Sequence, residues 1–224
     1  MLEKIPFSWL ESNGWLVLSG SKDTLSEMRA QALSRLNVDG AIAYVSLAGD
    51  LGDSLMEDMA ELGAPTGYFV DLEDDDNNAI YERLKDASMI VIEPGDDIFT
   101  LKRLMTQTVI RALKEALNLG ALILFEGLAS NLMGEHIITL DGQVIKGLSF
   151  VNNVFISANV DSILEIVDMQ RIYETAPQTV FIGIPYGSAL VLGPSGHIET
   201  WGDKQVTISL GSGLEDTDSS NNNI

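Results

Sequence analysis

The chain has 224 residues, of which 33 are acidic and 13 are basic, so its formal net charge is −20. This charge opposes binding to nucleic acid or to an anionic membrane surface, and we expect neither as a partner. The absence of cysteine excludes disulfides, a thiol nucleophile and a thiolate metal site. No apolar run approaches the ~18 residues of a membrane span and no leader is recognisable, so we expect a cytoplasmic protein.

The first half of the chain is predicted to alternate between strands and helices. The predicted strands are Trp15–Ser19, Ala41–Leu47, Tyr68–Leu72, Ser88–Ile92 and Ala121–Phe125. The predicted helices are Met28–Leu36, behind a capping box of Thr24 and Glu27, then Ser54–Leu62, Asp76–Asp86 and one long helix from Asp96 to Gly120. This order predicts an α/β protein with right-handed crossovers and a mostly parallel sheet that has helices on both faces.

The pattern changes after Glu135. Asp141 and Gly142 lie between alternating residues, which predicts a β-hairpin. The following predicted elements are a strand at Val154–Val160, a helix at Ser162–Tyr173 capped by Asp161, a strand at Thr179–Ile184 and a hairpin or meander at Ala189–Leu210. Residues 211–224 are polar, so we predict a single α/β domain over residues 1–210 followed by a disordered tail.

Residues 120–135, GALILFEGLASNLMGE, are predicted to form a strand, a sharp turn and a helix. In α/β proteins such a junction points the side chain of the turn into a crevice at the carboxyl ends of the strands, where these folds carry their chemistry. The residue at the sharpest point is Gly127, which has no side chain to contribute.

This segment resembles the nucleophile segment of the S51 peptidases, the cyanophycinase and dipeptidase E group. In that family a strand of type GAVIA runs into Gly-Thr-Ser-Ala-Gly and then into Met-Gly-Glu. The matching residues are Gly120, Ala121, Met133, Gly134 and Glu135. Gly14–Gly20 resembles the family's first strand, and Gly147–Asn153 resembles its Gly-Leu-Gly-Phe-Val-Pro segment. The resemblance implies a doubly wound sheet of the class I glutamine amidotransferase-like kind, with Gly127 in place of the nucleophilic serine.

The resemblance also places the other parts of the family's mechanism, and they are missing. The family's histidine falls on Asn159, which cannot act as a base near neutral pH. Its acidic motif falls on Gly183–Gly187, GIPYG, which has no carboxylate. Its glycine-rich loop falls on Glu93–Asp96, where Pro94 has no N–H to donate to an oxyanion. We therefore expect a catalytically inactive protein that acts as a binding or scaffold protein.

The residues around the turn define a candidate binding crevice. Its members are Glu93, Pro94, Gly95, Asp96, Glu126, Gly127 and Leu128. If the fourth and fifth strands are neighbours, Glu93, Asp96 and Glu126 could meet there and bind Ca²⁺ or Mg²⁺, which prefer oxygen ligands. The simpler interpretation is that they are carboxylates of a helix start and a solvated rim. We expect no other cofactor, and the sequence identifies no ligand.

Two alternatives remain open at this point. The first is an active hydrolase of altered mechanism that uses a bound metal or Ser130, the only hydroxyl close after the turn, although a small residue packed in a first helical turn is the simpler interpretation. The second is a structural role, as the partner of an active paralogue or as a homodimer that buries the apolar hairpin region after residue 136. We predict that the two histidines, His136 and His197, lie on the surface in or beside hairpins.

Overall fold

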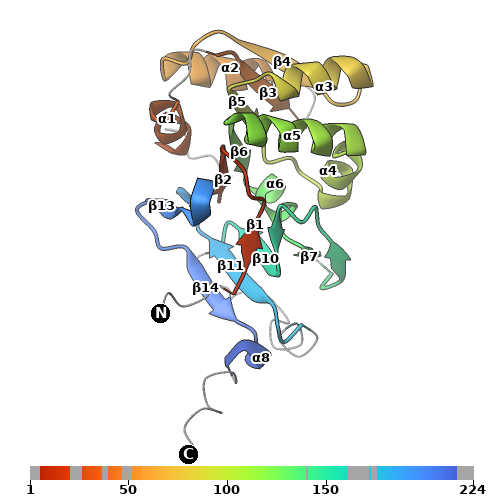
Figure 1. Ribbon diagram of the computed structural model, residues 1–224, viewed down its shortest axis with the longest axis vertical. Coiled ribbons are helices and arrows are strands. Elements are labelled where there is room, and N and C mark those ends of the chain that lie inside the picture. Colours follow the sequence, from red (N-terminus) through yellow and green to blue (C-terminus); the bar gives the residue numbers. More distant parts are fainter. Residues whose placement is uncertain are drawn as a thin grey trace, which may run out of the picture.

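The computed structural model describes residues 6–20, 27–36, 40–46, 52–139, 141–160, 172 and 176–215. Most of the strands form two sheets, which lie one above the other in Figure 1. Helices cover the upper sheet, and the C-terminal strands build much of the lower one.

The larger sheet has seven strands in the order β13-β12-β2-β6-β5-β3-β4. Their bounds are Trp15–Ser19 for β2, Ile42–Ser46 for β3, Gly67–Asp71 for β4, Met89–Ile92 for β5, Leu122–Glu126 for β6, Ser188–Leu192 for β12 and Ile198–Gly202 for β13. The strands from β2 to β4 are all parallel, whereas β12 runs antiparallel to β2 and to β13. The five predicted strands and the adjacency of β5 and β6 are therefore confirmed.

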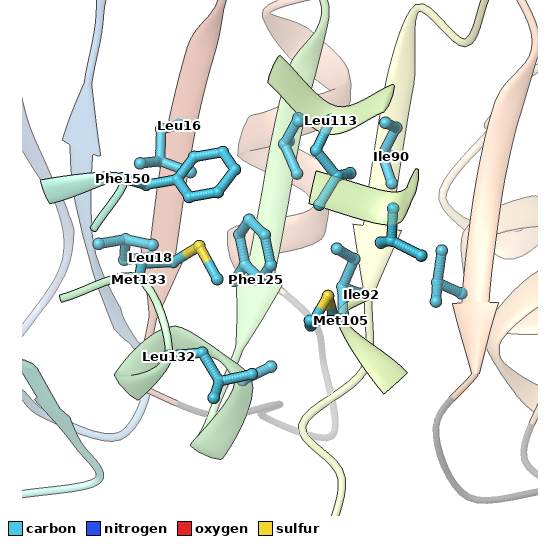
Figure 2. Close-up of a cluster of buried hydrophobic side chains, with 14 of the residues drawn as sticks. Leu16, Leu18, Ile90, Ile92, Met105, Leu113, Phe125, Leu132, Met133 and Phe150 are labelled. Atoms are coloured by element: carbon cyan, nitrogen blue, oxygen red, sulfur yellow. The ribbon is translucent and has the colours of Figure 1, made fainter. Parts of the chain in front are cut away.

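Helices lie on both faces of this sheet, as predicted. One face packs against α1 (Glu27–Ser34) and α2 (Gly52–Glu61). The other face packs against four helices: α3 (Asn77–Lys85), α4 (Ile98–Leu104), α5 (Gln107–Leu119) and α6 (Leu128–Asn131). Figure 2 shows the hydrophobic core between the sheet and these four helices, in which Phe125 of β6 lies near Met133 and Met105.

The single long helix predicted from Asp96 to Gly120 is wrong, because the structure divides it into α4 and α5. Met105 has a non-helical ψ of 66° and ends α4. Thr106 then begins α5, and its side chain accepts a hydrogen bond from the N–H of Val109 at 3.4 Å. A threonine cap inside a continuous apolar pattern is hard to recognise, because the apolar spacing carries on across the break.

The smaller sheet has five strands in the order β14-β11-β10-β7-β8. Their bounds are His136–Ile138 for β7, Val144–Lys146 for β8, Val154–Ala158 for β10, Val180–Ile184 for β11 and Thr207–Leu210 for β14. The central strands β7, β10 and β11 are parallel, and the two edge strands are antiparallel to their neighbours. The predicted hairpin around Asp141 and Gly142 is confirmed as β7 and β8, but it belongs to a second sheet that the sequence did not reveal.

Short elements complete the fold. A two-stranded sheet joins β1 (Ser8–Trp9) to β9 (Val151–Asn152), and the 3-10 turn Pro194–Gly196 links β12 to β13 as the predicted hairpin. No helix in the described part of the chain is long and apolar enough to cross a membrane.

The C-terminal region is ordered beyond the predicted boundary. Residues Ser212–Glu215 form α8, the N–H of Gly211 donates to the carbonyl of Thr179 at 3.0 Å, and the N–H of Gly213 donates to that of Pro177 at 2.9 Å. The prediction that disorder begins at residue 211 is therefore wrong for residues 211–215. Residues 216–224, the predicted helix start at Ser162 and the capping residue Thr24 lie outside the described residues.

Candidate functional site

The elbow between β6 and α6 is formed by Gly127, as the sequence predicted. Its φ of 53° and ψ of −126° are a combination that a residue with a side chain adopts only under strain. The N–H of Gly127 donates to the carbonyl of Ser19 at 3.1 Å, which ties the elbow to the end of β2. The backbone geometry of a sharp strand-to-helix turn is present without a side chain to use it.

Pro94 occupies the space above Gly127. A Cβ added to Gly127 would lie 2.8 Å from the Cβ of Pro94 and 3.4 Å from the carbonyl oxygen of Gly20. Non-bonded carbon atoms favour separations of about 3.5–4.0 Å, so the first of these contacts would force a shift. A nucleophilic side chain at the elbow therefore requires the loop that carries Pro94 to move.

Ser130 is not placed to act as a nucleophile. Its side chain is fully buried, and Oγ lies 2.9 Å from the carbonyl oxygens of both Ser19 and Phe125, to either of which it can donate. A hydroxyl held in this way has no access to substrate. The structure supports the simpler interpretation, in which Ser130 is a small residue packed in the first turn of α6.

Glu126, the residue before the elbow, forms a buried ion pair with Arg29 of α1. The Nε of Arg29 donates to Oε1 of Glu126 at 2.9 Å and its Nη2 donates to Oε2 at 2.5 Å, while both side chains are about 1% exposed. The Nη1 of Arg29 also donates to Asp58 of α2 at 3.1 Å. This is the bidentate geometry that makes arginine–carboxylate pairs strong and directional.

The charges around Arg29 keep it protonated despite its burial. Burial alone would lower the pKa of Arg29, but the hydrogen bonds and charge of Glu126, together with the charges of Asp58 and Glu93, raise it. Arg29 was not predicted as a site residue, because nothing in the apolar pattern of α1 shows that this side chain points toward the sheet. The available signal was Glu126 itself, since a carboxylate at the end of a wholly apolar strand needs a cation once it is buried.

The three carboxylates of the predicted cation site have different surroundings. Both oxygens of Glu126 accept hydrogen bonds from Arg29, Glu93 is buried near the same guanidinium, and Asp96 is exposed to solvent. Among the residues that the structure describes, no group of three acidic or histidine side chains is arranged to hold a metal ion. The cation that balances Glu126 belongs to the chain itself.

The members of the proposed crevice have different surroundings. Glu93 and Glu126 lie around Arg29, and Pro94 lies against Gly127. Gly95 adopts a φ of 60° in the loop after β5, and Leu128 packs partly buried against the core. Asp96 is exposed to solvent.

The structure also describes the other positions to which the resemblance assigned catalytic groups. Asn159 is exposed, has a φ of 63° and donates its N–H to the carbonyl of Ile184 at 2.8 Å. The segment GIPYG, which begins with the last two residues of β11, presents Tyr186, which is 47% exposed, instead of a carboxylate. His197 is exposed and hydrogen-bonds to Glu199 at 2.6 Å, as predicted for a surface residue. His136 is only partly exposed, and its ring lies tilted against that of Phe155 with 5.2 Å between the ring centroids, so its predicted surface position is wrong.

The matched Met-Gly-Glu segment has a structural role, which we call the 134/147 junction: residues 132–135 and 147–153 held against each other. Gly147, Leu148, Ser149 and Val151 donate backbone hydrogen bonds of 2.7–3.1 Å to the carbonyls of Glu135, Leu132, Gly134 and Met133. The carboxylate of Glu135 accepts the N–H of Asn153 at 2.8 Å. A Cβ at Gly147 would lie 2.1 Å from the carbonyl oxygen of Gly134, so only glycine fits there.

Together these features define an α/β protein with a mostly parallel main sheet and a sharp strand-to-helix turn at Gly127. Among solved structures the chain is similar to a peptidase from an acI-B1 actinobacterium, with 21% identity, a TM-score of 0.69 and coverage of 90% of this chain and 93% of that one. It is also similar to a peptidase E candidate from Listeria monocytogenes EGD-e, with 14% identity, a TM-score of 0.64 and coverage of 85% and 99%. At these identities the likeness shows the fold alone. No family model and no curated protein sequence matches the chain.

Proposed function

We propose that the chain is a catalytically inactive S51 peptidase-like protein that acts as a binding or scaffold protein. The contact between Pro94 and the elbow carries this proposal, because it fills the position that a nucleophilic side chain would need. The similarity to two peptidase structures supports the fold on which the proposal rests. The proposal keeps the cytoplasmic location expected from the sequence.

A serine hydrolase needs a nucleophile, a base that takes its proton, and N–H donors that stabilise the oxyanion. At the positions given by the resemblance, this chain has Gly127, Asn159 and Pro94, none of which can supply the corresponding function. The nearest hydroxyl, that of Ser130, is buried and hydrogen-bonded to backbone carbonyls. Glu126 is committed to Arg29 and so is not available as a replacement base.

The proposal is tested by trying to restore hydrolysis in steps. Wild type, Gly127→Ser and Gly127→Ser/Pro94→Gly are incubated with a panel of Asp-Xaa dipeptides and with a cyanophycin-like polymer, beside an active peptidase E as positive control. We expect no turnover by any of the three. Pro94→Gly creates room for the serine, but Asn159 still offers no base, and a general base alone is worth about 10²–10⁴ in rate.

Two outcomes would contradict the proposal. Turnover by the wild type that is lost in Ser130→Ala would establish an altered mechanism through that hydroxyl. Turnover by the double variant would show that a base and an oxyanion site survive, and that only the nucleophile and its space are missing. Circular dichroism of each variant ensures that an inactive sample is still a folded one.

A further inference from the structure

Strand β14 forms an open edge of the five-stranded sheet. Within the described residues it pairs only with β11, and Figure 1 shows it at the outer side of the lower sheet. Two of its four residues are large, apolar and exposed, Ile208 by 50% and Leu210 by 38%. An edge with free main-chain groups and apolar side chains is a template for pairing with another strand.

The hydrogen bonding of β11 shows which main-chain groups of β14 face outward. Gly211, which extends the register of β14, donates its N–H to Thr179 at 3.0 Å. Hydrogen-bonded and non-hydrogen-bonded residue pairs alternate along an antiparallel ladder. The main-chain N–H and C=O groups of Ser209 and Thr207, two and four residues before Gly211, therefore also point toward β11. The main-chain groups of Ile208 and Leu210 therefore point away from the sheet. In agreement, Val180 opposite Leu210 donates its N–H to Asn153 on its other side.

The exposed side chains of Ile208 and Leu210 lie on the same face of the five-stranded sheet as residues of β11 that belong to the hydrophobic core. Ile208 lies opposite Ile182 and Leu210 opposite Val180, and both of these partners are buried in the main hydrophobic cluster. Directly opposite residues of an antiparallel pair share one face. Val206, just before β14, packs partly buried against the same cluster. Val206, Ile208 and Leu210 thus form an apolar stripe, which we call the β14 stripe.

Strand β14 also differs in charge from the other three edges of the two larger sheets. The edge strands β4, β8 and β13 carry Asp71, Lys146 and Glu199, whereas β14, with the sequence TISL, has neither a charge nor a proline. Charged residues and prolines are the usual means by which proteins keep sheet edges from pairing. In a chain of net charge −20, an uncharged edge is a place where two copies can approach without direct repulsion.

We propose that the β14 stripe is the contact between two copies of this chain, paired antiparallel across a two-fold axis at Ile208. In this register Ile208 faces the partner's Ile208, and Leu210 faces the partner's Val206. The stripe is then self-complementary, as a two-fold interface requires, and the outward main-chain groups of both strands meet as hydrogen-bonded pairs. The contact is short, so the dimer forms in a concentration-dependent way. The inference depends only on the sheet edge and is independent of the proposed function.

The test is sedimentation velocity of the full chain over a series of protein and salt concentrations. We expect a monomer–dimer equilibrium that salt strengthens, because screening reduces the repulsion between two copies of charge −20. Ile208→Lys places like charges opposite each other and should weaken the dimer at least about tenfold. Its circular dichroism and thermal midpoint should stay close to those of wild type, since Ile208 is half exposed.

A matched control is Val144→Lys, which puts the same charge on the opposite edge of the same sheet, at a residue that is 42% exposed. This variant should dimerise like wild type. A wild type that stays monomeric up to about 1 mM, or equal weakening by both lysine substitutions, overturns the proposal. Dimerisation that begins only after removal of residues 216–224 also overturns it, because the chain's own C-terminal segment would then be the occupant of the edge.

Discussion

The elbow and the 134/147 junction both match the S51 pattern in position, but they match it in different ways. At the junction the residues themselves agree, because Gly134, Gly147 and Glu135 pack backbone against backbone and close the hydrogen bonds between two segments. At the elbow only the backbone agrees, since Gly127 replaces a side chain and Pro94 takes its place. A match at packing positions therefore indicates the fold, and only the side chains at the elbow indicate chemistry.

The elbow also has a support that the junction lacks, the buried pair of Arg29 and Glu126. We expect Arg29→Met to lower the free energy of unfolding by about 3–5 kcal/mol, because it leaves a buried carboxylate without its cation. Urea unfolding followed by circular dichroism measures the loss. We thus expect the largest loss of stability from a substitution beside the elbow and not at the junction.

Two further variants control for this prediction. Arg83→Met removes an exposed ion pair with Asp75 and should cost less than about 1 kcal/mol. Arg29→Met/Glu126→Gln should recover part of the loss, because no buried charge is left unpaired. A double variant less stable than Arg29→Met would mean that Glu126 has another stabilising partner.

The junction should tolerate no added side chain at Gly147. We expect Gly147→Ala to cost about 3 kcal/mol, since its Cβ would meet the carbonyl oxygens of Gly134 and Leu132, which are backbone atoms that cannot rotate away. Gly196→Ala is the control, because its Cβ would meet nothing within 4 Å and only its φ of 79° is unfavourable, at about 1 kcal/mol. Equal losses in the two variants would contradict the close packing inferred for the junction.

The contact between Pro94 and Gly127 should appear as a coupling between two substitutions. Gly127→Ala should cost about 1–3 kcal/mol from its φ of 53° and its contact with Pro94. In the background of Pro94→Gly the cost should fall by about 1 kcal/mol, because the opposing Cβ is gone. Gly120→Ala has open space at a φ of 101° and should show no such coupling. If the stability losses of Gly127→Ala and Pro94→Gly were simply additive, the loop that carries Pro94 would move aside for the added Cβ at no cost.

Much of the larger sheet could be predicted from the sequence, because its strands are short apolar runs and its helices have regular apolar spacing. Strands β2 to β6 and the elbow were predicted within one or two residues. The break before Thr106 was not, because apolar spacing continues through Met105 into Val109. The smaller sheet was not predicted either, since its parallel pairing joins β7, β10 and β11 across long stretches of sequence that no local signal connects.

At the candidate site, the residue types could be read from the sequence, but their tertiary contacts could not. Gly127, Asn159 and Pro94 could be read directly as residues without the needed chemistry. Their replacement is a matter of tertiary contact: Pro94 against Gly127, and Arg29 against Glu126 over 97 positions of sequence. The same holds for the predicted cation site, because sequence spacing suggested three neighbouring carboxylates without showing that Arg29 pairs with Glu126.

The smallest expected effect on stability concerns Asp97, which follows the loop that carries Pro94 and is the N-cap residue of α4. Its side chain caps α4 by accepting the N–H of Thr100 at 2.7 Å, and this hydrogen bond lowers the pKa of Asp97 below its ordinary value of 3.8. A lowered pKa in the folded state stabilises the protein fully at pH values above the ordinary pKa, and this contribution is lost as the pH falls toward the folded-state pKa.

The wild type should therefore lose stability more steeply on acidification than Asp97→Asn, and the two curves of stability against pH should converge in acid. Urea midpoints measured from about pH 5 down to about pH 2.5 test this, with Asp96→Asn as the control for removal of one exposed charge. Parallel curves for wild type and Asp97→Asn would show that the cap does not depend on the charge of Asp97, and the comparison between the elbow and the junction would then rest on the buried contacts alone.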